Sequence, residues 1–133
     1  MVLVDWVYNI LDYAEKKRTG ISWGGLEIQA QLGFTPDKGN QYQAAGDYLD
    51  KVLKKFIISE KDAVIDCGCG KGRAMWILAK AGFGCVDGYD ISQKLIGEAN
   101  LNFKQLGVSS ICKAFAADAV LYHDYDKDTY IYV

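Results

Sequence analysis

Apolar runs and helical stripes alternate along the second half of the chain. Runs typical of buried strands occupy residues 63–67, 84–89, 110–115 and 129–133. Between them, residues 71–81 and 93–106 place apolar side chains three and four positions apart, which is the period of a helix with one buried face. Strands that alternate with helices form parallel sheets through right-handed crossovers. The pattern therefore predicts an α/β fold, with a parallel sheet covered by helices on both faces.

The residues that flank the two predicted helices support their boundaries. Gly82 follows the first helix and Gly107 follows the second, and glycine is favoured just past a helix C-terminus because it adopts the left-handed conformation. Ser92 precedes the second helix and is a typical N-cap, because its hydroxyl accepts a hydrogen bond from an amide of the first turn. The side chains that we expect to face inward from this helix are Leu95, Ile96, Ala99, Phe103 and Leu106.

The first 60 residues predict a helical cap ahead of the sheet. Residues 2–18 have a helical period, with apolar side chains on more than one face, so we expect this helix to pack on more than one surface or to cover a ligand. Residues 19–40 contain several glycines and the one proline, which predicts a compact, ordered loop. Residues 41–56 carry the clearest helical stripe. Its members are Ala45, Tyr48, Leu49, Val52, Leu53 and Phe56.

Size and composition narrow the class of protein. We expect residues 1–133 to form one domain, with residues 1–60 as the helical cap and residues 61–133 as the sheet. The net charge is −2 without a basic block, so the chain has no nucleic-acid signature. It has neither an apolar run of membrane-spanning length nor a signal peptide. The four cysteines lack the paired spacing of a zinc site or a disulfide framework, so we expect reduced thiols, no metal and a cytoplasmic protein.

A glycine-rich segment follows the first predicted strand directly. Gly68, Gly70 and Gly72 occupy every second position after Asp66, and a helical pattern begins at once behind them. A glycine turn between a strand and a helix brings bare backbone close to a nucleotide-like ligand, because no Cβ stands in the way. Lys71 within this segment is compatible both with contact to a carboxylate and with exposure to solvent.

Three acidic residues follow three successive predicted strands. They are Asp66, Asp90 and Asp118. The carboxyl ends of parallel strands meet at one edge of the sheet, and α/β proteins bind their ligands there. A carboxylate at the end of the second strand can accept hydrogen bonds from both hydroxyls of a ribose, and one after the third strand can accept from the exocyclic amino group of adenine. The spacing therefore predicts a site for an adenosine-containing ligand.

Two features distinguish between the candidate ligands. A dinucleotide fingerprint has the spacing G-x-G-x-x-G, whereas here the sixth position is Arg73. Asp66 at the head of the turn is unfavourable beside a pyrophosphate but suits a ligand with an ammonium group. Both features favour S-adenosylmethionine, whose amino-acid end is zwitterionic, over a nicotinamide dinucleotide. An NAD(P)-dependent oxidoreductase remains an alternative.

The motif Asp66-x-Gly68-x-Gly70-x-Gly72, followed by Asp90 and by Asp118, resembles class I S-adenosylmethionine-dependent methyltransferases. An upstream segment resembles a group of small bacterial members of that family, and it reads Phe34-Thr35-Pro36-Asp37-x-Gly39-Asn40-x-Tyr42. The resemblance covers nearly the whole chain. It implies a Rossmann-like fold, S-adenosylmethionine as the cofactor and transfer of a methyl group to an acceptor, which stays unknown.

The resemblance also implies roles for single residues. The three glycines would line the methionine part of the cofactor, and Asp66 would organise the turn and the bound amino group. Asp90 would hold the ribose hydroxyls, and Ile91 would pack against adenine. Asp118 would meet the adenine amino group, and the backbone of Ala117 the edge of the ring. Tyr42 would close over the cofactor. We assign no catalytic residue, because the one histidine, His123, lies in a polar segment that we expect to be solvated.

The chain departs from the family at its C-terminus. The family resemblance implies seven strands and an Asn-Pro-Phe-like segment after the fourth, whereas here the fourth predicted strand, residues 129–133, is the last. We therefore expect a fragment with about four of the seven strands. A second alternative is a non-catalytic interaction module, because an unpaired apolar strand favours pairing with another copy. We expect a homodimer through residues 129–133.

Overall fold

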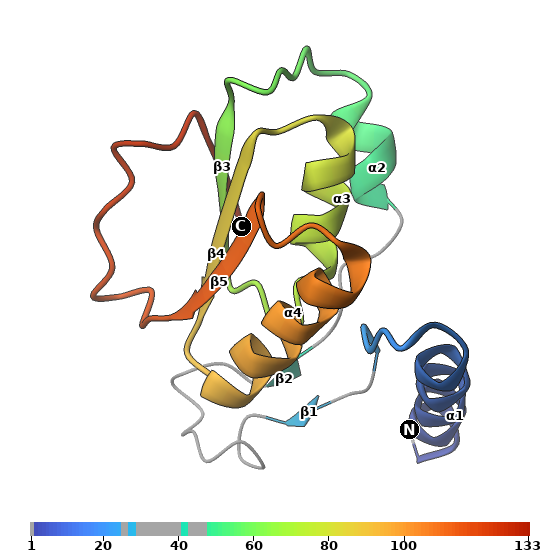
Figure 1. Cartoon of the computed structure of the whole chain (residues 1–133). Helices are drawn as coiled ribbons and strands as arrows, with labels where there is room; N and C mark the ends of the chain where they lie inside the picture. The colour runs from blue at the N-terminus through green and yellow to red at the C-terminus, as the bar shows by residue number, and fades with distance from the viewer. Residues whose placement is uncertain (1, 25–26, 29–40, 43–47) are drawn as a thin grey trace.

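The computed structural model of the chain describes residues 2–24, 27–28, 41–42 and 48–133 (Figure 1). Its main sheet has four strands in the order β5-β4-β3-β6, and every neighbouring pair is parallel. The strands are β3 (Ala63–Cys67), β4 (Cys85–Asp90), β5 (Cys112–Ala116) and β6 (Tyr130–Tyr132). The predicted parallel α/β sheet is confirmed. All four strands form close to their expected positions, and β3 lies between β4 and β6.

Both predicted crossover helices are present and end where predicted, although the first begins at residue 73 rather than 71. They are α3 (Arg73–Ala81) and α4 (Gln93–Leu106). Gly82 with φ 114° and Gly107 with φ 70° end them in the left-handed conformation. At the start of α4, the hydroxyl of Ser92 accepts a hydrogen bond from the amide of Leu95 at 3.3 Å. The chain between 63 and 116 therefore folds as its local pattern predicts.

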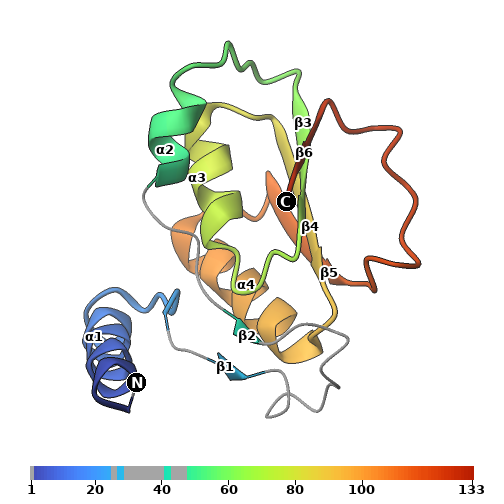
Figure 2. The ribbon, with the colours of Figure 1, turned by 180° about the vertical axis from the view of Figure 1, so that it is seen from behind.

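The helices cover the sheet differently from the prediction. In both views, α3, α4 and the short helix α2 (Tyr48–Leu53) lie on one side of the sheet, and residues 117–129 cross the other side (Figures 1 and 2). The order of the strands explains this arrangement. The chain steps from β3 to β4 to β5 in one direction, and two right-handed crossovers in the same direction place both helices on the same face. Within the described residues, helices on both faces are therefore not observed.

The core lies between the sheet and this helical layer. Alternate strand residues point into it, and they meet apolar side chains of α3 and α4. The largest fully buried members are Val64, Met75, Leu78, Val86, Phe103 and Cys112. Gly88 of β4 allows α3 to approach closely, because a Cβ there would lie 2.5 Å from the sulfur of Met75. Each large side chain buried in this way stabilises the fold by about 1.5–3 kcal/mol.

Residues 117–129 pack against the opposite face. Tyr89 of β4 and Phe115 of β5 contact Tyr122, with ring centroids 4.8 and 5.5 Å apart. The hydroxyls of Tyr89 and Tyr125 lie 2.9 Å apart. Lys127 forms an ion pair with Asp87 of β4, with 2.6 Å between Nζ and Oδ2. The single histidine, His123, is exposed in this segment, as expected.

The first helix, α1 (Val2–Thr19), forms as predicted but does not pack as predicted. Both views show it beside the body of the molecule rather than against the sheet (Figures 1 and 2). Val7, Ile10 and Leu11 belong to its predicted apolar faces, and all three are exposed. The expectation that these faces pack on other surfaces is therefore wrong for these residues. Among the helices that the structure describes, none is long and apolar enough to cross a membrane.

The predicted helix over residues 41–56 is observed in part. Gln41–Tyr42 is a short strand, β2, which pairs antiparallel with β1 (Glu27–Ile28). Among the described residues the helix α2 covers Tyr48–Leu53 and does not continue to residue 56, with Leu49 buried and Tyr48 73% exposed. Pairing with a distant segment has overridden the local helical pattern at residues 41–42. Ala45 and the upstream motif at residues 34–40 lie outside the described residues.

Candidate functional site

The glycine turn joins β3 to α3 at the carboxyl end of the sheet. Gly68, Gly70 and Gly72 have φ values of 89°, 52° and 87°, a region in which side-chain-bearing residues are strained. A Cβ on Gly72 would overlap the ring of Phe103, so this position must stay bare for α4 to pack. A Cβ on Gly68 would meet no atom of the described residues within 4 Å, apart from its two neighbours in the chain. Within the described part of the chain, the turn is therefore closed toward α4 and open at Gly68.

The amide groups of the turn already have partners within the protein. The amides of Gly68 and Cys69 donate to the carbonyl oxygen of Tyr89 at 2.9 and 2.8 Å. The amide of Gly70 donates to Oδ2 of Asp90 at 3.1 Å, and that of Gly72 to the carbonyl of Cys69 at 2.9 Å. A phosphate-binding loop presents such amides to its ligand. Because these four donors are engaged, the turn is poorly suited to a pyrophosphate.

Asp90 anchors the turn from the end of β4. Its Oδ2 accepts from the amide of Gly70, and its Oδ1 accepts from the amide of Ser92 at 2.9 Å. One carboxylate therefore connects the glycine turn to the N-cap of α4. Each carboxylate oxygen can accept a second hydrogen bond, so capacity for hydroxyl donors of a ligand remains. The sequence predicts the position of Asp90, and the structure adds an anchoring role that the sequence analysis missed.

Asp66 is the electrostatically unusual residue of the site. It is 3% exposed, and among the described residues its buried Oδ2 has no hydrogen-bond partner. Burial, reinforced by the charge of Asp90, raises the pKa of Asp66 to about 7. Unpaired buried carboxylate oxygens are rare in folded proteins. A cationic donor next to Oδ2 would stabilise the ionised form, so this position favours a ligand with an ammonium group.

The segment after β5 joins the same edge of the sheet. The amide of Ala117 donates to the carbonyl of Asp90 at 3.0 Å, which links the ends of β5 and β4. Oδ1 of Asp118 accepts from the amide of Val120 at 3.0 Å and so caps the turn that follows. Ile91, next to Asp90, is half-buried. The structure thus brings Asp90, Ile91 and Ala117 together with the glycine turn, and it places Asp118 one residue further on.

The remaining predicted residue lies on another element. The backbone of Tyr42 belongs to β2, where it pairs with Glu27 of β1.

The four cysteines are free thiols. In the described parts of the chain, no group of three or more His, Cys, Asp or Glu side chains is placed to hold a metal ion.

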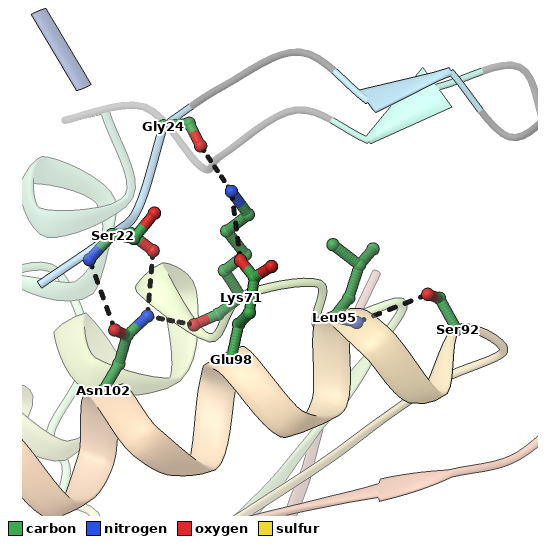
Figure 3. Close-up of polar contacts among 7 residues, drawn as sticks. All are labelled: Ser22, Gly24, Lys71, Ser92, Leu95, Glu98 and Asn102. Atoms are coloured by element: carbon green, nitrogen blue, oxygen red, sulfur yellow. Dashed lines mark hydrogen bonds and ion pairs between the residues drawn. The ribbon is translucent and has the colours of Figure 1, made fainter. Parts of the chain in front are cut away.

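A polar cluster that was not predicted from the sequence lies behind the turn (Figure 3). Lys71 is 4% exposed, so of its two predicted alternatives exposure to solvent is wrong and contact with a carboxylate is observed. Its Nζ donates to the carbonyl of Gly24 at 2.7 Å and forms an ion pair with Glu98 at 3.2 Å. Asn102 lies beside it and bonds to the backbone of Ser22. A lysine between two glycines of a buried turn was the one sequence signal for this cluster.

Comparison with known proteins shows a similarity to methyltransferases. Residues 64–132 match the family described as "Methyltransferase domain". None of the curated proteins matches the sequence of the chain. The solved structures similar to it include an RNA methyltransferase from Salinibacter ruber in complex with S-adenosyl-L-homocysteine, with a TM-score of 0.56 and 25% identity. That similarity covers 68% of this chain and 58% of the other.

A second similar structure is geranyl diphosphate C-methyltransferase from Streptomyces coelicolor A3(2), in complex with Mg²⁺, geranyl diphosphate and S-adenosyl-L-homocysteine. Its TM-score is 0.51 at 21% identity, and the similarity covers 59% of this chain and 30% of the other. At that identity the likeness concerns the fold. The chain spans less than two thirds of the length of either protein.

Proposed function

The chain belongs to the class I S-adenosylmethionine-dependent methyltransferase family and has its Rossmann-like fold, and from this we propose that it binds S-adenosylmethionine at the glycine turn and transfers the methyl group to an acceptor. The observation that carries the proposal is the buried Oδ2 of Asp66, which has no hydrogen-bond partner among the described residues, beside a turn in which four amides are already engaged. This combination disfavours a phosphate and favours a cation. S-adenosylmethionine has an ammonium group and a sulfonium group.

The residues present fit this cofactor group by group. Asp66 would accept a hydrogen bond from the ammonium group, and the open side of Gly68 would leave room for the methionine chain. Asp90 would receive the ribose hydroxyls on the acceptor capacity that its two backbone contacts leave. Ile91, Ala117 and Asp118 would surround the adenine. Tyr42 remains a proposed cover on the strength of the family resemblance alone.

The chemistry needs mainly orientation from the protein. When bound, S-adenosylmethionine supplies an electrophilic methyl group. The contribution of this chain would be to fix the amino-acid end at Asp66 and the ribose at Asp90, so that the methyl group is presented in one direction. Positioning and removal of water can supply most of the rate acceleration of such a transfer. We assign neither a general base nor an acceptor.

Calorimetry with S-adenosylmethionine, S-adenosylhomocysteine and NADH tests the proposal. We expect the two adenosyl ligands to bind and NADH not to bind. Asp66→Asn should weaken S-adenosylmethionine about ten- to a hundred-fold, because a hydrogen bond to a charged group contributes about 1.5–3 kcal/mol. The matched control is Asp87→Asn, which changes another carboxylate of the sheet, paired with Lys127 on the opposite face. Tight NADH binding without adenosyl binding would favour the oxidoreductase alternative instead.

One observation favours a second candidate, the interaction module. In the described sheet β6 is an outer strand, and its Ile131 is 56% exposed. Outer strands with exposed apolar side chains favour pairing with another chain. We therefore retain the homodimer through residues 129–133 as a proposal. Light scattering at increasing concentration should show a dimer that Ile131→Lys dissociates, and a monomer at all concentrations would contradict it.

A further inference from the structure

A short N-terminal segment packs next to the glycine turn although it lies far from it in sequence. Residues 21–24, called the strap below, have no regular secondary structure and lie next to α4 (Figure 3). Ile21, Ser22 and Trp23 are buried. The strap directly follows Gly20, where α1 ends with φ 75°. The strap therefore fixes the chain that follows α1 to the body of the molecule.

Asn102 of α4 bonds to the strap and to the turn at once. Its Oδ1 accepts from the amide of Ser22 at 3.3 Å, and its Nδ2 donates to the carbonyl of Ser22 at 2.9 Å. The same Nδ2 donates to the carbonyl of Lys71 at 3.1 Å. Because Asn102 is buried, losing the strap would leave part of its amide without a partner, at a cost of about 1–3 kcal/mol.

Lys71 makes the connection in the other direction. Its backbone is part of the turn, between Gly70 and Gly72, and its ammonium group donates to Gly24 of the strap. A buried ammonium group is stable only with close partners, and Lys71 has the strap carbonyl and the carboxylate of Glu98. A displaced strap would remove one of them. The conformation of the turn at Lys71 and the docking of the strap therefore depend on each other.

An aromatic contact adds a third link. Trp23 of the strap stacks on Trp76 of α3, with ring centroids 5.6 Å apart and planes inclined by 23°. The amide of Trp76 donates to the carbonyl of Gly72 at 3.0 Å, which closes the first turn of α3 onto the glycine turn. The strap thus contacts the turn at Lys71, α3 at Trp76 and α4 at Asn102.

We propose that the strap holds the glycine turn in its ligand-binding shape, with Lys71 as the positioning residue that couples them. Docking of the strap and binding of the cofactor are then linked equilibria, in which each favours the other. The claim that the strap is coupled to cofactor binding rests on the proposed function. The claim that the strap fixes the shape of the turn does not depend on it.

Two variants perturb the coupling from opposite ends. Ser22→Pro removes the amide that donates to Asn102 and leaves the turn unchanged. Lys71→Met keeps the length of the buried side chain but removes its ammonium group. Lys104→Met is the control, because it makes the same substitution at an exposed position of α4. Hydrogen exchange of the ligand-free protein reports on the turn, since the amides of Gly68, Cys69, Gly70 and Gly72 are all hydrogen-bonded.

We expect Ser22→Pro to accelerate exchange at these four amides about ten-fold and to raise the Kd of S-adenosylhomocysteine by a similar factor, within the five- to 150-fold range typical of coupled sites. Lys71→Met should have the same two effects, and Lys104→Met should have neither. The double variant Ser22→Pro/Lys71→Met should bind S-adenosylhomocysteine no more weakly than the weaker-binding single variant. Such non-additivity is expected because both changes act by undocking the same strap.

Unchanged exchange at the turn in Ser22→Pro, or effects that add in the double variant, would overturn the proposal. The two proposals fail separately. If the wild-type protein binds no adenosyl ligand, the proposed function is wrong, and exchange at the turn still decides the role of the strap. If Lys71→Met does not fold, Ser22→Pro alone decides it, because that change lies outside the turn.

Discussion

Phe103 and Leu11 are both apolar residues on helices with a clear helical period, yet Phe103 is 0% exposed on α4 and Leu11 is 60% exposed on α1. The difference lies in what the chain places beside each helix. The strands β4 and β5 directly flank α4 and supply a surface for its stripe. The segment that follows α1, the strap, docks on the body of the molecule through its backbone and the ring of Trp23, whereas the described stripe of α1 stays exposed. Periodicity therefore predicts a helix, whereas burial depends on a partner surface.

Substitution of these two residues tests the comparison directly and gives the largest expected effect on stability. Phe103→Ala should lower the free energy of unfolding by about 4 kcal/mol, because it removes a buried ring and leaves a cavity. Leu11→Ala should change it by less than about 0.5 kcal/mol, as surface substitutions do. Urea denaturation of both variants is the measurement. Comparable losses for the two would mean that α1 packs on a surface in solution.

The pH dependence of the free energy of unfolding should reveal the raised pKa of Asp66. The pKa of Asp66 is about 7 in the folded protein, above its ordinary value of 3.8, so the folded state binds this proton more tightly than the unfolded state. The free energy of unfolding should therefore fall as the pH rises from about 4 to 7, by on the order of 1 kcal/mol per pH unit. Denaturation across this range should show a steeper slope in the wild type than in Asp66→Asn, in which Asp128, whose pKa is also raised by burial, still contributes. Asp50→Asn, on the exposed side of α2, should keep the slope of the wild type.

Replacing two glycines, one packed against α4 and one within it, by alanine should change the stability in opposite directions. Gly72→Ala should destabilise by about 2 kcal/mol, because its Cβ would overlap Phe103 and its φ is positive. Gly97→Ala should stabilise by about 0.5–1 kcal/mol, because it lies within α4 and its Cβ would meet no described residue within 4 Å. Thermal melts of both variants test this. If Gly72→Ala were neutral, the close packing of α4 on the turn would be wrong.

A further effect, smaller than that of Gly72→Ala, concerns the start of α4. Ser92→Ala should lower the free energy of unfolding by about 1 kcal/mol, because the amide of Leu95 loses its acceptor. Ser92→Asp should retain most of the stability, since aspartate also caps helices. Equal losses for both replacements, measured by urea denaturation, would show that the hydroxyl contributes through packing rather than capping.

The elements between Ala63 and Ala116 were predictable because their signals are local. Each strand is a short apolar run, and Ser92, Gly82 and Gly107 mark the helix ends. The strand at residues 41–42 was not predictable, because it depends on pairing with residues 27–28. The one-sided helical layer was missed for a related reason. It follows from the order of the strands, which no local pattern specifies.

The site was predictable in position but not in its contacts. Strand ends place Asp66 and Asp90 at the same edge, which needs only the parallel sheet. Burial of Lys71 depends on Gly24, 47 residues away, and such a partner leaves no mark on the local sequence. The same holds for the two amides that Asp90 accepts from, since they become neighbours only after the turn and α4 have formed. The roles in cofactor binding stay predictions.

The most direct test of the central claim is calorimetric titration of the wild-type protein and Asp66→Asn with S-adenosylmethionine at pH 5, 6 and 7. If the ammonium group pairs with the ionised carboxylate of Asp66, the Kd of the wild type should fall up to about ten-fold per pH unit toward pH 7, because a proton must leave Asp66 on binding. Asp66→Asn should bind weakly at every pH, without this trend. No binding by the wild type, or the same affinity and pH dependence in both proteins, would contradict the account.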